Sequence, residues 1–176
     1  MTFGRVLVLG GSRSGKSAFA ESLLADAPAV DYLAASVVSA DDAEWSARVA
    51  AHRLRRPTSW RTVETGDISA ELTTGTVPAL VDSVTSWLAR AMDDCGAFNR
   101  GNDGAGLAAA IDRLSEAWSA TTRHVVAVSD EVGSGIVPET ASGRLFRDTL
   151  GTLNQRLAAQ ADAVYFVVAG LPQRLK

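Results

Sequence analysis

One stretch of eight residues constrains the fold of this chain more than any other feature. It reads GGSRSGKS over residues 10–17, follows the apolar run Val6–Leu9 and precedes a helical pattern over residues 18–24. It matches G-x-x-x-x-G-K-[ST], the phosphate-binding loop between a strand and a helix, at every fixed position. An accidental Gly/Ser turn is the alternative, and the flanking strand and helix patterns disfavour it.

The chemistry of this loop predicts a nucleoside triphosphate as ligand. The glycines let successive backbone N–H groups point at phosphate oxygens, Lys16 adds a cation, and the Ser17 hydroxyl can bind Mg²⁺. The expected phosphate contacts are Gly10, Gly11, Ser12, Arg13, Ser14, Gly15, Lys16 and Ser17.

Short apolar runs alternate with helical patterns along the rest of the chain. Strands are predicted at Arg5–Leu9, Val30–Ala34, Trp60–Glu64, Ala79–Val81, Val125–Ser129 and Val164–Val168. Helices are predicted at Lys16–Ala25, Asp42–Ala51, Thr85–Met92, Leu107–Ala120 and Arg144–Ala161. This order, with apolar runs that suit strands covered on both faces, predicts a three-layer α/β fold of the P-loop NTPase type with a mostly parallel sheet. Ligands of such sheets bind beyond the carboxyl ends of the strands.

Composition limits the remaining classes of protein. A chain of 176 residues with 47% hydrophobic residues can bury one core, so we expect a single domain over residues 1–176. The net charge of -3 does not favour nucleic-acid binding, and the single Cys95 excludes an internal disulfide. No signal segment or apolar run long enough to span a bilayer is evident, so we expect a cytoplasmic protein without membrane insertion.

Two groups of acidic residues follow predicted strands and could supply a second Mg²⁺ contact. Asp82 follows residues 77–81, and Asp130 and Glu131 follow residues 125–129. An acid at a strand end near the loop is a frequent Mg²⁺ contact in phosphoryl-transfer proteins, but it is also a common helix cap. The residues alone do not separate these alternatives.

A basic segment at residues 52–56, HRLRR, contains one of the two histidines of the chain. Nearby cations disfavour protonation of His52, and a neutral imidazole is a capable nucleophile. The arginines could also neutralise phosphates. A solvated basic helix end before Pro57 explains the same residues without a function, and the sequence physics favours it.

Four collinear segments together resemble a known family. They are Gly10–Ser17, the His52-Arg-x-x-Arg56-Pro57 segment followed by Trp60-Arg61-Thr62-x-Glu64, Ser129-x-Glu131-Val132-Gly133-x-Gly135-Ile136-Val137-Pro138, and Asn154-Gln155-Arg156-Leu157-Ala158. The combination is similar to the bifunctional adenosylcobinamide kinase / adenosylcobinamide-phosphate guanylyltransferase family of cobalamin synthesis, from the first strand to the last.

The resemblance implies two reactions on one P-loop scaffold. ATP or GTP phosphorylates the aminopropanol hydroxyl of adenosylcobinamide, and GTP then gives GMP to a histidine and from there to adenosylcobinamide phosphate, with release of pyrophosphate. The nucleophile falls on His52, with Lys16 as the second catalytic residue. The implied nucleotide contacts beyond the loop are Ala34, Ala35, Ser36, Arg53, Leu54, Arg55, Arg56, Glu64 and Asp82. The resemblance favours Asp82 over Asp130 as the partner of Ser17 in binding Mg²⁺.

Two positions depart from the pattern of the family. Aspartate stands at position 82, where members often have glutamate, and at position 130, where asparagine is common. These changes leave open the nucleotide preference of the kinase step and the relative strength of the two activities. The resemblance also implies a homo-oligomer, with trimers among the members. A P-loop switch protein and a small-molecule kinase without nucleotidyl transfer are the alternative functions.

Overall fold

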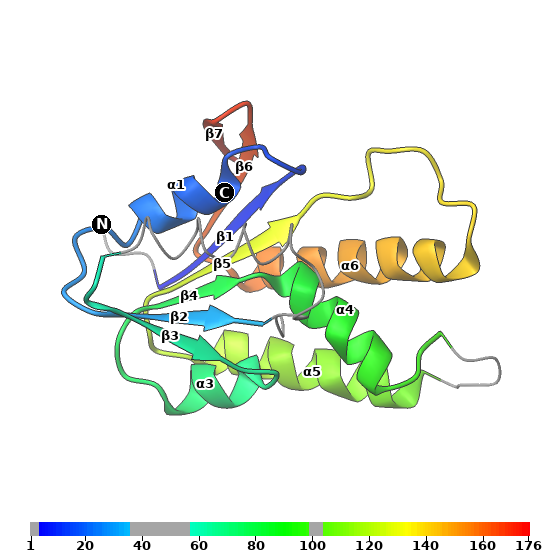
Figure 1. Ribbon diagram of the computed structural model, residues 1–176, viewed down its shortest axis with the longest axis horizontal. Coiled ribbons are helices and arrows are strands. Elements are labelled where there is room, and N and C mark those ends of the chain that lie inside the picture. The colour runs from blue at the N-terminus through cyan, green and yellow to red at the C-terminus, as the bar shows by residue number, and fades with distance from the viewer. Residues whose placement is uncertain (1–3, 36–56, 99–103) are drawn as a thin grey trace.

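The computed structural model describes residues 4–35, 57–98 and 104–176. These ranges form a seven-stranded sheet in the order β3-β2-β4-β5-β1-β6-β7 (Figure 1). The strands are β1 (Arg5–Gly10), β2 (Val30–Ala34), β3 (Trp60–Glu64), β4 (Ala79–Asp82), β5 (Val125–Asp130), β6 (Ala163–Val168) and β7 (Leu171–Arg174). Neighbouring strands run parallel except β6 and β7, which are antiparallel. The mostly parallel sheet expected from the sequence is confirmed.

The described helices alternate with the strands in the order that the sequence predicts, with differences in bounds and two additional elements. They are α1 (Lys16–Ser22), α3 (Ile68–Thr74), α4 (Val84–Asp94), α5 (Ala105–Ala120) and α6 (Ala141–Gln160). The first helix ends three residues earlier than expected, and α3 and β7 were not predicted. The helix expected at residues 42–51 lies outside the described residues.

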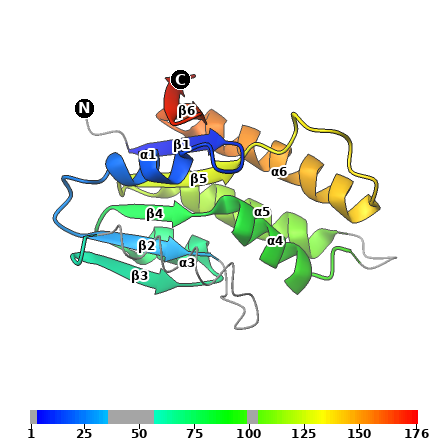
Figure 2. The same ribbon diagram turned by 45° about the horizontal axis from the view of Figure 1, so that its top comes forward.

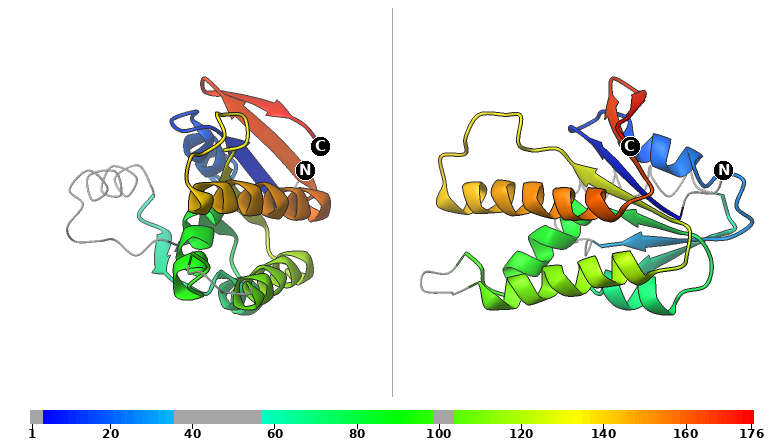
Figure 3. Two further views of the ribbon diagram at one scale, coloured as in Figure 1. Left: turned by 90° about the vertical axis from the view of Figure 1, so that its right-hand side faces the viewer. Right: turned by 180° about the vertical axis from the view of Figure 1, so that it is seen from behind.

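Each face of the sheet has its own hydrophobic core. Val6 and Val8 of β1 pack with Ala20 and Leu24 of the α1 region, whereas Leu7 packs on the opposite face with residues of α3, α4, α5 and α6. Successive side chains of a strand alternate between faces, so one strand serves both cores. Figures 2 and 3 show the sheet with α1 on one side and the helices α3, α4, α5 and α6 on the other. The described elements therefore form the predicted α/β/α layers.

The buried residues include large aromatic side chains. Trp60, Trp87 and Trp118 are buried, and Cys95 is partly buried against the core. Within the described ranges, none of the helices combines the length and the apolar character that a membrane crossing requires.

Candidate functional site

The alternation of side chains brings five strand ends to one face of the sheet. Val8, Tyr32, Trp60, Leu80 and Val128 all belong to the core beneath α1. The residues two or four positions further along these strands are Gly10, Ala34, Glu64, Asp82 and Asp130, which share the same face. Because the strands are parallel, these residues also lie at the carboxyl edge of the sheet, where α1 and the phosphate-binding loop begin.

Two glycines of the loop occupy positions that a larger residue could not. Gly15 has a φ of 93°, in the left-handed region that favours glycine. A Cβ atom on Gly10 would lie 2.5 Å from the Ser14 hydroxyl oxygen and 2.7 Å from the Val167 carbonyl oxygen. The fixed glycines of the motif are therefore required by the backbone and by close packing.

Lys16 forms an ion pair at this edge of the sheet. Its Nζ lies 2.6 Å from the Asp130 carboxylate and donates to the Gly11 carbonyl oxygen at 3.2 Å. The pairing follows from the sheet register, because Asp130 lies opposite Gly10 on the neighbouring strand. An ammonium held in this way at the mouth of the loop can be offered to a phosphate, with Asp130 as its partner in the protein.

The backbone of Asp130 is held by hydrogen bonds to side chains of two helices. Its N–H donates to the Thr85 hydroxyl of α4 at 2.8 Å, and its carbonyl accepts from the Asn154 side-chain amide of α6 at 3.1 Å. The Ser129 hydroxyl donates to the Asn154 side-chain oxygen at 2.7 Å. These contacts fix the end of β5 beside Lys16. Thr85 and Asn154 had no assigned role from the sequence, although Asn154 lies in one of the four family-like segments.

Asp82 is oriented by a buried tyrosine. The Tyr32 hydroxyl of β2 donates to the Asp82 carboxylate, and Tyr32 is buried in the core beneath α1. A buried tyrosine hydroxyl requires a polar partner, and this need was the one signal in the sequence that could have pointed to Tyr32. The carboxylate of Asp82 is thereby kept on the face of the sheet that carries the loop.

Neither candidate acid caps a helix, which resolves one alternative left open by the sequence. Ser83 follows Asp82 and caps α4, because its hydroxyl accepts from the Ser86 N–H at 3.2 Å. Asp130 is separated from α6 by a loop, and Thr140 caps that helix. Both carboxylates therefore act at the carboxyl edge in other ways, Asp82 as the partner of Tyr32 and Asp130 as the partner of Lys16.

Glu131, the other acid of the second group, is occupied within its own loop. Its carboxylate accepts from the backbone N–H groups of Gly133 at 2.7 Å and Ser134 at 3.2 Å. Hydrogen bonds from Ser134, and then from the Gly133 amide, lower the pKa of Glu131 against the opposing effect of burial. Glu131 shapes the turn after β5 and remains ionised at neutral pH.

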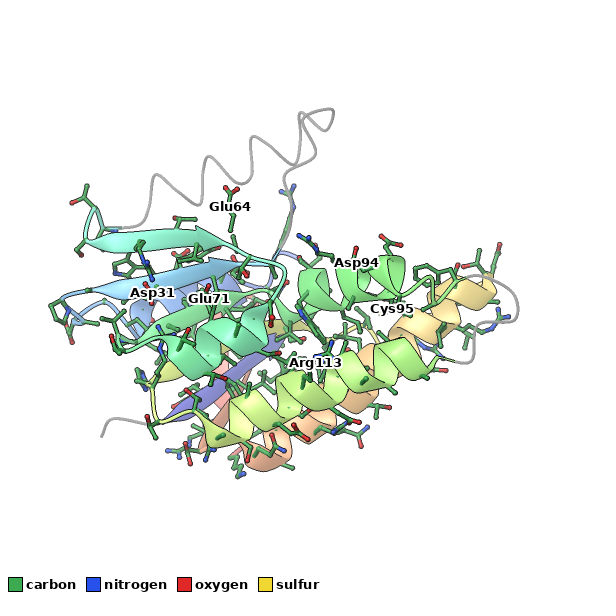
Figure 4. All side chains as sticks on the ribbon, turned by 90° about the horizontal axis from the view of Figure 1, so that it is seen from below. Asp31, Glu64, Glu71, Asp94, Cys95 and Arg113 are labelled. Carbon is green, nitrogen blue, oxygen red and sulfur yellow. The ribbon has the colours of Figure 1, made fainter. Side chains whose placement is uncertain are left out.

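The remaining predicted contacts divide into three groups. Ala34 lies beside both Glu64 and Asp82 in the register, and Glu64 is exposed on the side of the sheet away from α3 and α5 (Figure 4). Ala35 is fully buried on the opposite face, and its N–H donates to the Asp82 carbonyl at 3.4 Å. The predicted nucleophile His52 lies outside the described residues, as do Ser36, Arg53, Leu54, Arg55 and Arg56.

The sequence is similar to named proteins over nearly its full length. The "Bifunctional adenosylcobalamin biosynthesis protein CobU" of Salmonella typhimurium is 40% identical over 181 residues, covering 97% of this chain and 99% of that protein. The protein of the same name in Escherichia coli is 38% identical over 182 residues, with coverage of 97% and 99%. The CobP protein of Pseudomonas aeruginosa is 38% identical over 178 residues, with coverage of 98% and 97%.

Solved structures show the same fold at low sequence identity. A type III secretion ATPase from pathogenic bacteria superimposes with a TM-score of 0.58 at 14% identity, and the match covers 97% of this chain and 56% of that one. The ATPase EscN of enteropathogenic Escherichia coli gives a TM-score of 0.57 at 13% identity, with coverage of 96% and 43%. This chain thus spans little more than half of the first ATPase and less than half of the second. These likenesses establish a P-loop NTPase fold, which fits nucleotide binding.

The family model described as "Cobinamide kinase / cobinamide phosphate guanyltransferase" matches residues 6–175. Together with the relatives near 40% identity, this match covers the loop, both candidate acids and the loop after β5. The chain therefore belongs to the cobinamide kinase / cobinamide phosphate guanyltransferase family.

Proposed function

We propose that this chain carries out both reactions for which its family is named. In the first, the hydroxyl oxygen of adenosylcobinamide attacks the γ-phosphorus of ATP or GTP, and the nucleoside diphosphate leaves. In the second, a nitrogen of His52 attacks the α-phosphorus of GTP, a P–N bond forms and pyrophosphate leaves. A phosphate oxygen of adenosylcobinamide phosphate then displaces His52, which gives adenosyl-GDP-cobinamide.

The observation that carries this proposal is the grouping of Lys16, Asp82 and Asp130 at the carboxyl ends of the strands. The chain also matches relatives of this family over nearly its full length. Phosphoryl transfer depends mainly on positioning and on neutralising charge, and the loop with Lys16 supplies both. The amides of Gly10–Ser17 would hold the phosphates, while Lys16 would neutralise charge that develops on the outer ones.

The residues at this edge also fit Mg²⁺. Ser17 lies in the first turn of α1 directly after the loop, and Asp82 presents a carboxylate held by Tyr32. No group of three His, Cys, Asp or Glu side chains suited to a metal occurs in the described ranges. Mg²⁺ at such loops takes most of its ligands from phosphates and water, so Ser17 and Asp82 suffice. When bound, the ion would supply positive charge that neutralises the phosphates.

Labelling with GTP that carries radioactive phosphorus at the α position tests the His52 step. We expect the wild type to acquire an acid-labile, base-stable adduct, as a phosphoramidate should, and His52→Asn to acquire none. The chain has two histidines, so His124→Asn is a matched control that keeps the adduct. A wild type without label, or label retained in His52→Asn, contradicts the nucleotidyl-histidine step.

The labelling experiment, combined with an assay of adenosylcobinamide phosphorylation, separates the alternative functions. A P-loop switch would bind nucleotide but would neither form the adduct nor phosphorylate adenosylcobinamide. A small-molecule kinase would phosphorylate adenosylcobinamide without an adduct. Assays with ATP and GTP in parallel give the nucleotide preference, and sedimentation of the purified protein tests the homo-oligomer that the family resemblance implies.

A further inference from the structure

The turn between β6 and β7 lies directly against the phosphate-binding loop. The Gly170 N–H donates to the Ser14 carbonyl oxygen at 2.8 Å. A Cβ atom on Gly15 would lie 3.0 Å from the Gly170 Cα atom. Figures 1 and 3 show the β6–β7 hairpin beside the loop that follows β1. The hairpin therefore forms a wall on one side of the loop.

This contact fixes the orientation of one peptide in the loop. The Ser14–Gly15 peptide is trans, so its C=O and N–H groups point in opposite directions. The Ser14 carbonyl is directed at the hairpin by the bond from Gly170. The Gly15 N–H consequently points away from the hairpin, and the backbone N–H groups of such loops are the phosphate donors.

The hairpin is built to hold the Gly170 N–H in a defined place. Ala169 and Gly170 have φ values of 51° and 79°, and they connect the paired residues Val168 and Leu171. Positive φ at both central residues is the signature of the tight two-residue turn that matches strand twist. At its other end, Lys176 Nζ donates to the carbonyls of Ala158 at 3.3 Å and Ala159 at 3.0 Å, so the hairpin is tied to the end of α6.

We propose that the Gly170 amide is a positioning group for the triphosphate: by holding the Ser14 carbonyl, it presents the Gly15 N–H to a phosphate oxygen. The inference rests on the proposed function in so far as phosphates bind at the loop. It adds a role for the β6–β7 hairpin, which carries no part of the phosphate-binding motif.

Replacing one amide by an ester tests this role without changing a side chain. Full-length protein is made with glycolic acid in place of Gly170, which removes the N–H donor and keeps the backbone path. The matched control has the α-hydroxy acid of leucine at position 175, because the Leu175 N–H donates to the Val164 carbonyl, also at 2.8 Å, at the end of the hairpin away from the turn. Each ester removes one backbone hydrogen bond of equal length.

Affinity for inorganic triphosphate and for a non-hydrolysable GTP analogue is measured by calorimetry. The Gly170 ester should raise both dissociation constants about fivefold, whereas the Leu175 ester should leave them within about twofold. Thermal unfolding should shift to a similar extent in both proteins. A purely structural role predicts equal binding in the two esters, and that result overturns the proposal.

Side-chain variants give a second, independent measurement. Gly170→Val places a β-branched residue at positive φ and should weaken triphosphate binding, whereas Gly170→Asn should bind like the wild type, because asparagine adopts this region more readily. Equal binding by Val and Asn variants contradicts the proposal. If the wild type itself binds no triphosphate, the proposed function fails with it, which distinguishes that failure from a failure of positioning alone.

Discussion

One ion pair lies at the amino ends of the strands and another at their carboxyl ends. The first pair stabilises the fold, whereas the second lies beside the phosphate-binding loop. At the amino edge, Arg123 Nη2 lies 2.7 Å from Asp31, and the two side chains are 3% and 4% exposed. At the carboxyl edge, Lys16 Nζ lies 2.6 Å from Asp130, with exposures of 12% and 27%. The distances are nearly equal, so the difference lies in the surroundings.

Each of the three side-chain nitrogens of Arg123 donates a hydrogen bond to a group of the protein. Besides Asp31, it donates to the Val77 carbonyl at 2.6 Å and to the Glu71 carbonyl at 2.7 Å, which joins β2, α3 and the loop before β4. Lys16 instead has one carboxylate and one carbonyl as partners among the described residues. A buried pair with every partner supplied by the chain supports the fold, whereas a half-open pair at the mouth of a loop can exchange its partner for a ligand.

Arg123→Met should produce the largest loss of stability. It leaves Asp31 buried without its principal cation, so the free energy of unfolding should fall by about 3 to 5 kcal/mol in urea titrations. Arg61→Met is the matched control, because Arg61 Nε pairs with the same carboxylate at 2.9 Å but is 69% exposed. Arg61→Met should be far milder. Equal losses in the two variants would mean that burial does not distinguish the partners of Asp31.

Lys16→Ala should greatly reduce activity while changing stability little. Phosphorylation of adenosylcobinamide should fall by more than about a hundredfold, because the proposed function assigns to this cation the neutralisation of the transferred group. The free energy of unfolding should change by less than about 1 kcal/mol, since Asp130 can be hydrated. Steady-state assays and urea titration of the same preparation measure the two quantities. Retained turnover would remove the loop from the kinase step.

Gly75→Ala tests how rigidly the amino-edge pair is held. A Cβ atom on Gly75 would lie 1.8 Å from Arg123 Nη1, although the backbone conformation of Gly75, with φ of -72°, suits alanine. We expect a loss of about 2 kcal/mol in unfolding free energy from this clash. Gly151→Ala, on α6 with no atom within 4 Å of the added Cβ, should instead stabilise slightly. An unchanged stability for Gly75→Ala would show that Arg123 moves freely.

Asp130→Asn should have the smallest effect of the four changes, and it should strengthen nucleotide binding. It removes a carboxylate that holds Lys16 and repels phosphate, so the dissociation constant of a non-hydrolysable GTP analogue should fall about fivefold. Asp162→Asn is the control, because it removes the same charge from the pair with Arg5 at the amino edge. Weaker binding in Asp130→Asn alone would indicate that the carboxylate supports the bound state.

The elements missed by sequence reasoning are those that tertiary contacts create. Strand β7, with the sequence LPQR, is exposed along its length and carries no apolar run; it forms because β6 offers an open edge with which it pairs. Helix α3 is seven residues long, and its apolar positions Ile68 and Leu72 are too few for a clear pattern. Asp67, whose side chain accepts from the Ala70 N–H at 3.0 Å, was its available signal.

The sequence by itself determined the phosphate-binding loop motif and the alternating strands and helices, because these depend on local patterns of neighbouring residues. Only the tertiary structure decided that β5 lies between β1 and β4. That order pairs Asp130 with Lys16 and leaves Asp82 to Tyr32. It also brought Gly170 against Ser14. Sheet order and register join residues far apart in the chain through the packing of whole elements, and no local pattern encodes them.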